Sequence, residues 1–182
     1  SKEDIEIAGF LAATIAWGNR KMIIKSAQKL MDAMGNAPFD FVMHHTATDL
    51  KRLDHFVHRT FNNLDAITFI QSLQNIYKNH NGLEAVFHKF SEKDSTQKGI
   101  SEFKKVFFEI PHASRTTKHI SDPLNNSAAK RINMFLRWMV RKDNKGVDFG
   151  IWDSLSPEAL SCPLDVHSGN VARKLNLLTR KQ

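Results

Sequence analysis

The sequence predicts an all-α protein, and three observations support this class. Apolar residues recur at helical spacing through most of the 182 residues. No stretch shows the alternating pattern of a half-buried strand. Hydrophobic residues make up 41% of the chain and charged residues 25%, which is ordinary for a globular protein. We expect one helical domain over residues 1–182, or two small helical lobes with a cleft between them.

The helices follow one another with short breaks. The first is apolar nearly all round, which predicts a buried central helix. Gly35 is expected to stop the second, Asn63 to cap the fourth, and Asn81-Gly82 to end it. The last is expected to bury Val171, Leu175 and Leu178. The expected ranges are 4–16, 21–34, a short helix near 50–57, 64–77, 83–90, 100–110, 128–141 and a final helix from Asp165.

Composition excludes several classes. No run of 18 apolar residues is present, so no bilayer span is expected, and no secretory signal is visible. Cys162 is the single cysteine, which excludes an intramolecular disulfide and a four-cysteine metal or iron–sulfur site. His44 and His45 do not form a metal-binding pattern, so we expect neither a metal nor a cofactor. The cytoplasm of a bacterium, close to the nucleoid, is the expected compartment.

The positive charge is concentrated in one part of the chain. The net charge is +7, and the segment 112–146 holds eight Lys and Arg residues against two Asp, a net charge of +6. Such a segment attracts a polyanion such as nucleic acid. A solvated basic face that aids solubility would have the same composition.

A first candidate for chemistry is Lys130, in the stretch Asp122-Pro-Leu-Asn-Asn-Ser-Ala-Ala-Lys-Arg131. Ser127 is the expected N-cap of the helix that follows, which places Lys130 in its first turn. The positive end of the helix dipole and Arg131 both disfavour the protonated amine, and a neutral amine is a nucleophile. The alternative is an exposed stripe of Lys130, Arg137 and Arg141 facing phosphates.

A second candidate is Asp165, in the stretch Cys162-Pro-Leu-Asp-Val-His-Ser-Gly-Asn-Val171. A carboxylate immediately before a helix accepts hydrogen bonds from the free amides, which hold it ionised. It can then stabilise positive charge on a sugar ring while a glycosidic bond breaks. A structural N-cap without chemistry is the alternative.

Three pieces of the sequence resemble the helix-hairpin-helix DNA glycosylases, in the order found in that family. Leu164-Asp-Val-His167 with Val171 and Leu175 is similar to the signature V-D-T-H-x-x-R-V-x-x-R-L around the catalytic aspartate. Leu124 precedes Lys130 by six residues, as in the hairpin L-P-G-V-G-x-K. The stretch 13–20, Ala-Thr-Ile-Ala-Trp-Gly-Asn-Arg, resembles the early helix ending in L-L-S-x-Q-x-T-D, which inserts residues beside a flipped nucleotide.

The whole chain also resembles an uncharacterised bacterial family. The motifs that carry this second resemblance are Ala-Trp-Gly-Asn-Arg, Phe-Leu-Arg-Trp-Met-Val-Arg and Pro-Leu-Asp-Val-His-Ser-Gly-Asn-Val-Ala-Arg. Members of the glycosylase family continue further at both ends, so part of the pocket is expected outside these 182 residues.

The sequence departs from the glycosylase pattern at the hairpin. Asn126 and Ala128 replace its two glycines, although Asn125 and Asn126 can adopt the left-handed conformation of a compact turn. The spacing of 35 residues between Lys130 and Asp165 is closer to that of the archaeal 8-oxoguanine glycosylases than to that of endonuclease III.

The glycosylase resemblance implies excision of a damaged base, such as an oxidised purine, from double-stranded DNA. Lys130 and Asp165 would be catalytic, and lyase action at the resulting abasic site would follow. The residues expected to bind DNA are Arg115, Lys118, Asn125, Asn126, Ser127, Arg131, Arg137 and Arg141. The residues expected at the base pocket or inserted into the duplex are Trp17, Asn19, Arg20 and His167.

Two other readings of the same residues stay open. The first is a DNA-binding helix-hairpin-helix module without catalysis, which the missing glycines favour. The second is a helical domain that binds RNA or another protein. For Trp17, packing at a helix end is the alternative to base contact, while Trp138 and Trp152 are expected to be packing residues.

Overall fold

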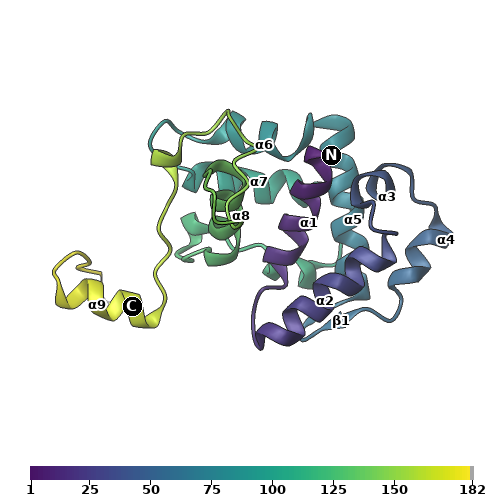
Figure 1. The fold of residues 1–182 in the computed structure, drawn as a ribbon, viewed down its shortest axis with the longest axis horizontal. Coiled ribbons are helices and arrows are strands. Elements are labelled where there is room, and N and C mark those ends of the chain that lie inside the picture. The colour runs from purple at the N-terminus through teal and green to yellow at the C-terminus, as the bar shows by residue number, and fades with distance from the viewer. Residues whose placement is uncertain (181–182) are drawn as a thin grey trace.

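The computed structural model describes residues 1–180, and helices dominate it (Figure 1). Helix α1 (Lys2–Thr14) begins at a capping box in which Ser1 and Asp4 exchange hydrogen bonds. It packs against α2 (Arg20–Ala33), α3 (Pro38–His44) and α8 (Lys130–Val140). The prediction of a buried first helix is therefore confirmed.

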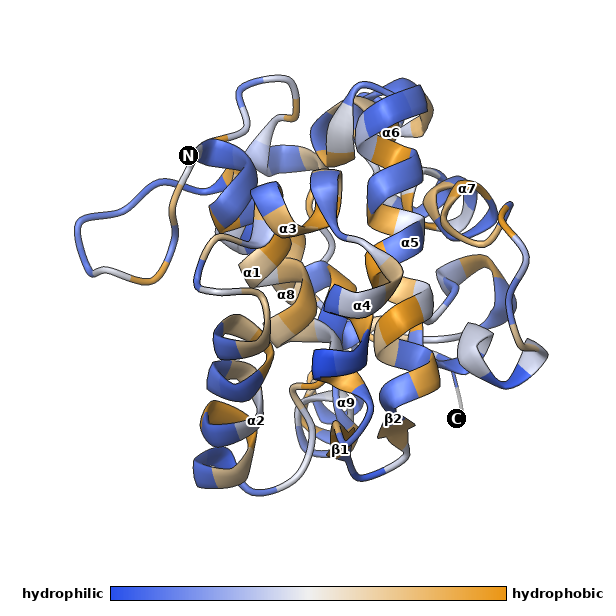
Figure 2. Ribbon diagram, turned by 90° about the vertical axis from the view of Figure 1, so that its right-hand side faces the viewer, coloured by the Kyte–Doolittle hydropathy of each residue, from blue (hydrophilic) through white to orange (hydrophobic). Residues whose placement is uncertain are grey.

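Helix α2 covers one side of this arrangement. Asn19 caps it by accepting a hydrogen bond from the amide of Lys21 at 2.9 Å. In Figure 2, its hydrophilic residues lie along the side turned away from the rest of the molecule. Leu30 on the inner side is buried, whereas Met22, which lies on the predicted apolar face, is exposed.

The region between α2 and the next long helix differs from the prediction. It contains α3, which the sequence does not predict. Helix α4 (Ala47–Leu50) and the 3-10 turn η1 (Lys51–Leu53) follow. A two-stranded antiparallel hairpin follows, with β1 (Val57–His58) pairing β2 (Phe61–Asn62). These short strands leave the all-α class intact, because helices account for 61% of the structure.

Three helices form the opposite side. They are α5 (Asn63–Asn79), α6 (Gly82–Phe90) and α7 (Gln97–Phe107), with α6 packing on both of the others. Asn62, one residue before the predicted Asn63, caps α5. The break at Asn81-Gly82 is confirmed, and both residues have left-handed φ angles of 58° and 89°.

The segment between α7 and α8 contains only two 3-10 turns, η2 (Ser114–His119) and η3 (Pro123–Asn125). Helix α8 then begins at Lys130, two residues later than predicted. Between α8 and the last helix the chain is irregular apart from η4 (Pro157–Ala159), as the sequence indicates for residues 143–161.

The last helix, α9 (Val166–Lys174), stands apart from the body of the molecule (Figure 1). Its N-cap is Asp165, as predicted. The predicted burial of its apolar side is wrong, because Val171 is 56% exposed and Leu175 is 61% exposed. None of the helices in residues 1–180 is long and apolar enough to cross a membrane.

Phenylalanine rings make up the centre of the core. Phe10 on α1 lies within 5.4–5.8 Å, centroid to centroid, of the rings of Phe69, Phe103, Phe107 and Phe135. These rings come from α5, α7 and α8, so Phe10 joins both sides of the molecule. Trp152 is also buried, which confirms its packing role.

Candidate functional site

A cleft of about 620 Å³ opens where the end of α1 faces the start of α8. The turn after α1 forms one wall and the segment 121–129 another. Four of the predicted site residues lie in this lining together: Trp17, Ser127, Lys130 and Arg131. The lining residues are Ala13, Ala16, Trp17, Ser121, Ser127, Ala128, Ala129, Lys130, Arg131, Met134 and Trp138.

The indole ring of Trp17 is held by three neighbours. The ring of His58 meets it edge-on at 5.2 Å, and the ring of His119 lies nearly parallel at 6.1 Å. The guanidinium of Arg131 covers it, with the central carbon 4.7 Å from the ring centroid. Trp17 is therefore partly buried and fixed in orientation, while still lining the cleft.

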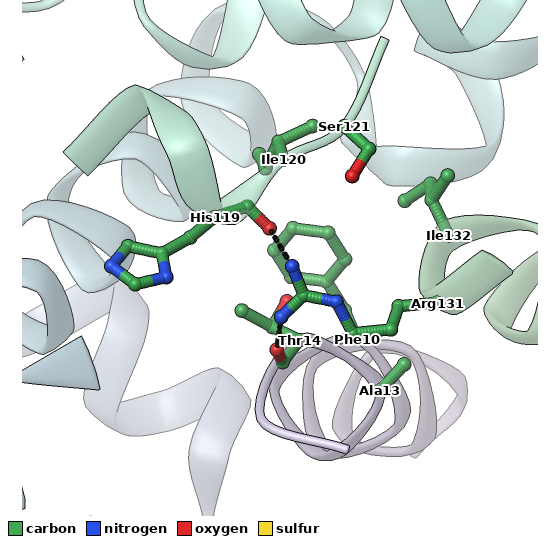
Figure 3. A pocket seen from close by; sticks show the side chains of 8 residues that line it. All are labelled: Phe10, Ala13, Thr14, His119, Ile120, Ser121, Arg131 and Ile132. Atoms are coloured by element: carbon green, nitrogen blue, oxygen red, sulfur yellow. Dashed lines mark hydrogen bonds between the residues drawn. The ribbon is translucent and has the colours of Figure 1, made fainter. Parts of the chain in front are cut away.

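Arg131 is committed to contacts inside the protein. It donates hydrogen bonds to the carbonyl oxygen of Thr14 and, at 3.3 Å, to that of His119 (Figure 3). Burial lowers the pKa of Arg131 from its ordinary value. The guanidinium joins the end of α1 to the end of η2, so these contacts differ from the predicted role of binding DNA phosphates.

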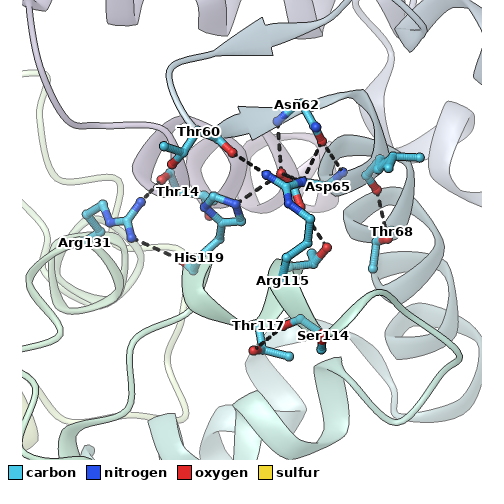
Figure 4. Close-up of polar contacts among 12 residues, drawn as sticks. Thr14, Thr60, Asn62, Asp65, Thr68, Ser114, Arg115, Thr117, His119 and Arg131 are labelled. Atoms are coloured by element: carbon cyan, nitrogen blue, oxygen red, sulfur yellow. Dashed lines mark hydrogen bonds and ion pairs between the residues drawn. The ribbon is translucent and has the colours of Figure 1, made fainter.

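Asp65 lies at the centre of a buried polar network (Figure 4). Its carboxylate accepts hydrogen bonds from Arg115 Nη1 at 2.7 Å, Thr116 Oγ1 at 2.7 Å and the amide of Asn62 at 3.0 Å, and His119 Nε2 lies 3.2 Å away. Burial alone would raise the pKa of Asp65, but these hydrogen bonds and positive charges lower it. The network attaches η2 to the start of α5.

Two predicted DNA-binding residues on η2 therefore differ in their surroundings. Arg115 pairs with Asp65 and also donates to the carbonyl oxygen of Thr60 at 2.9 Å. Its charge is largely compensated inside the protein. Lys118, by contrast, is exposed on the same turn.

Two buried histidines beside Trp17 were not found from the sequence. His58 lies 2.9 Å from Ser26 Oγ and 3.2 Å from the carbonyl oxygen of Trp17. Burial lowers the pKa of His119, and this effect outweighs the opposite influence of Asp65. Neither histidine belongs to a motif or a periodic pattern, so no local signal marks them.

The turn before α8 contains two residues in left-handed conformations. Asn126 has φ 62° and Ala129 has φ 45°, whereas the sequence comparison placed the second glycine position at Ala128. Ser127 Oγ accepts from the amide of Ala129 at 3.2 Å, and Ala129, not Ser127, is the N-cap of α8. Helix α8 thus starts without a side-chain cap. Lys130 is its first residue and is exposed in the cleft wall.

Asp165 caps α9 as the sequence predicts. Its carboxylate accepts a hydrogen bond from the amide of Ser168 at 2.8 Å, and Ser168 Oγ donates to it at 2.8 Å. These hydrogen bonds lower the pKa of Asp165, and the charges of His167 and Lys130 contribute in the same direction. The side chain is fully exposed, so the carboxylate is ionised and accessible. Asp165 does not belong to the lining of the cleft that contains Lys130.

The other predicted site residues are spread over the surface. Asn125 and Asn126 are exposed on the turn, and Asn125 Nδ2 donates to Asp122 at 2.7 Å. Arg20 is exposed at the first turn of α2, next to the capping Asn19. His167 is exposed on α9, while Arg137 and Arg141 contact the buried Asp148.

The fold and this cleft define a mostly helical protein in which an aromatic ring and a lysine line one cleft, while an exposed carboxylate caps the separate helix α9. The family model described as "Protein of unknown function (DUF2400)" matches residues 1–182, and the chain belongs to this family. No curated protein and no solved structure matches the chain. The function is therefore inferred from the residues around the cleft.

Proposed function

We propose that this protein is a base-excision enzyme of the helix-hairpin-helix DNA glycosylase class, acting on a damaged base in duplex DNA. The observation that carries the proposal is the convergence of two distant segments. Trp17 after α1 and Lys130 at the start of α8 line one cleft. Asp165 stands at the start of α9, outside this lining, and its part in the proposal rests on the sequence resemblance. These are the three segments that resemble the glycosylase family.

The local backbone around Lys130 supports the same class. Short turns lead into a compact bend with left-handed residues at Asn126 and Ala129, and a helix follows directly. A bend of this kind normally needs glycine, because a side chain at positive φ is unfavourable. The bend therefore forms without glycine, and its second left-handed residue, Ala129, follows by one position the place where the resemblance puts the second glycine.

The chemistry expected of the pair can be written in steps. The neutral amine of Lys130 attacks the anomeric carbon of the sugar, and the glycosidic bond breaks with its electron pair leaving on the base, which takes up a proton. Asp165 stabilises the positive charge that develops on the sugar ring. The lysine nitrogen loses a proton, the ring opens to an iminium, and loss of a sugar C2′ proton with departure of the 3′ phosphate cleaves the strand.

Trp17 is suited to the extruded nucleotide or to the gap that it leaves. Extruding a base costs a few kcal/mol of stacking, and an aromatic ring in the protein can restore about 1–3 kcal/mol per base. Arg131 and the two histidines hold the indole ring in place, so little further ordering of the ring is needed when a base stacks on it.

Borohydride trapping on a duplex with an abasic site tests the proposal. The aldehyde of the abasic site condenses with the amine of Lys130 and releases water, and hydride reduces the iminium to a stable amine. A covalent adduct is expected for the wild type and for the control K78A, since Lys78 is exposed at the far end of α5. The adduct should be absent in K130A. Absence of any adduct in the wild type would overturn lysine chemistry.

Asp165 can be tested without disturbing the helix that it caps. Asparagine is as good an N-cap as aspartate, so D165N keeps the cap and removes the charge. Excision from a duplex panel that includes 8-oxoguanine should fall by about 10²-fold or more, by analogy with other transition-state contacts. Trapping at a preformed abasic site should persist, because that step does not require the glycosidic bond to break.

The same experiments distinguish the other two readings. Tight binding of duplex DNA without excision or adduct is expected of a non-catalytic DNA-binding module. Competition between duplex DNA and structured RNA at fixed salt tests the RNA-binding domain, and a marked preference for RNA would contradict a role in DNA repair.

A further inference from the structure

Arg137 on α8 and Arg141, the C-cap residue of that helix, share a single buried carboxylate. Arg137 Nε donates to both oxygens of Asp148 at 3.2 Å, and Arg141 Nε lies 3.7 Å from the second oxygen. The Asp148 side chain has no exposed surface, whereas those of Arg137 and Arg141 are 41% and 51% exposed. The carboxylate therefore orients both guanidinium groups from their buried side, Arg137 through two hydrogen bonds and Arg141 through an ion pair.

The outer ends of both guanidinium groups are available. Each arginine contacts Asp148 through Nε, and the hydrogen bonds found among residues 1–180 include none from the Nη atoms of Arg137 or Arg141. Two guanidinium charges against one carboxylate leave a single positive charge. This is the charge needed to neutralise one phosphodiester, and an arginine fork matches two phosphate oxygens in geometry.

These arginines line a pocket of about 450 Å³ between α8 and the segment 157–163. Met134 lines this pocket and also the cleft that contains Lys130, so the two are neighbours along α8. The rise of a helix is about 1.5 Å per residue, which puts Arg137 about 10 Å along α8 from Lys130. At about 3.4 Å per nucleotide in a duplex strand, this is a separation of up to about three nucleotides.

Asn133 is a further polar residue in the lining of this pocket. It lines the pocket and is 6% exposed, yet its Oδ1 has no hydrogen-bond partner among the described residues. Its Nδ2 donates to the carbonyl oxygen of Ala129 at 3.1 Å, which fixes the amide. A buried acceptor without a donor is unfavourable. This oxygen has almost no exposed surface, so the polar groups that the pocket offers to a ligand are those of its two arginines.

We propose that this pocket is a nucleotide subsite in which Arg137 and Arg141 bind one backbone phosphodiester close to the reacting sugar. The assignment of the ligand to a DNA strand rests on the proposed function, whereas the preference for a phosphodiester rests on the arginine pair. Arg115 and Arg131 do not take part, because their guanidinium groups are used inside the protein.

Methylphosphonate scanning tests the subsite. A duplex with a stable abasic analogue carries one neutral methylphosphonate at each position within three nucleotides of the analogue. Wild-type affinity, measured by fluorescence anisotropy, is expected to fall about tenfold at one position, the loss of one charge-assisted contact. In R141Q the affinity for the unmodified duplex should already be reduced, and that position should no longer be sensitive.

Salt dependence and two further variants complete the test. The slope of log K against log salt should fall by about one in R141Q. In the control K78Q the contact at this subsite should be unchanged, so its methylphosphonate profile should match that of the wild type. R137Q removes a hydrogen-bond donor from the buried carboxylate of Asp148. If this single variant does not fold, the double variant R137Q/D148N, which keeps the wild-type net charge, tests the arginine pair instead.

The outcomes separate the subsite from the chemistry. A position-specific loss that disappears in R141Q supports the subsite even if the wild type gives no borohydride adduct. Identical methylphosphonate profiles for the wild type and R141Q would overturn it even if the adduct forms. Failure of the wild type to bind any duplex would overturn it as well.

Discussion

The guanidinium of Arg131 lies over the indole ring of Trp17, with 4.7 Å between its central carbon and the ring centroid. The same guanidinium donates to the carbonyl oxygens of Thr14 and His119. One side chain on α8 therefore holds the end of α1, the end of η2 and the tryptophan of the cleft in a fixed relation.

Replacing Arg131 by alanine is expected to destabilise the protein by about 3 kcal/mol. The cation–π contact contributes about 0.5–2 kcal/mol, and each buried carbonyl left without a donor costs about 1–3 kcal/mol. Urea denaturation measures the loss, and the fluorescence of the native state should report altered surroundings of Trp17. R131K keeps the charge but lacks the planar fork, so it should recover only part of the stability. Equal stability of R131A and wild type would refute this role.

Replacing Phe10 by alanine is expected to cost about 3–5 kcal/mol, because its ring contacts four other phenylalanine rings in the core. F10L should cost about 1.5 kcal/mol, since most of the volume is retained. Both values follow from urea titrations with an unchanged m-value. A loss under 1 kcal/mol for F10A would mean that the core does not centre on this ring.

Replacing Ala129 by glycine is expected to stabilise the protein by about 1 kcal/mol. Ala129 has φ 45°, and the left-handed conformation costs a non-glycine residue about 1–2 kcal/mol, part of which is offset by the greater freedom of glycine when unfolded. The neighbouring Ala128 has no positive φ, so A128G should instead destabilise by about 0.4–1 kcal/mol. Thermal denaturation of the two variants should give shifts of opposite sign.

Stability is expected to fall with decreasing pH in two windows. His119 has a folded pKa below its ordinary value because of burial, so its contribution is complete above about pH 6.5 and is lost as the pH falls below that value. Hydrogen bonds overcome the effect of burial and lower the pKa of Asp65, so its contribution is complete above about pH 4 and is lost below it.

The variants H119Q and D65N should each remove one of these windows. The difference in free energy of unfolding between wild type and H119Q should shrink as the pH falls from 7 to 5. The difference between wild type and D65N should shrink only below about pH 4. A difference that stays constant with pH would show that the substituted residue does not titrate differently on folding.

The parts of the fold that the sequence predicted are those decided by local pattern. Helix α9 begins after Asp165 and the break at Asn81-Gly82 ends α5, because capping and left-handed turns are properties of a few adjacent residues. The predicted start of α8 lies two residues too early, because alanine rarely adopts a left-handed conformation and the sequence therefore does not indicate one at Ala129. Helix α3 was missed because seven residues give too little periodicity.

The candidate site was predictable only in part for a different reason. The sequence shows that Arg115 is positive, but not that it lies 2.7 Å from Asp65, fifty positions earlier in the chain. The apolar residues on one face of α9 predict that this face is buried. Burial also requires another element that packs against the face, and the spacing of apolar residues along α9 does not show whether one is present. The sequence likewise does not indicate that Asp148 contacts Arg137 on α8 and Arg141 at the end of that helix.

The position of Arg131 has a consequence for how charge acts in the cleft. Its guanidinium is partly buried, and no carboxylate is among its hydrogen-bond partners in the described chain. Water and dissolved ions screen a charge of this kind much less than a lysine on the surface. Arg131 therefore gives the cleft wall a permanent positive potential that persists at high ionic strength, and it can attract an anionic strand without touching it.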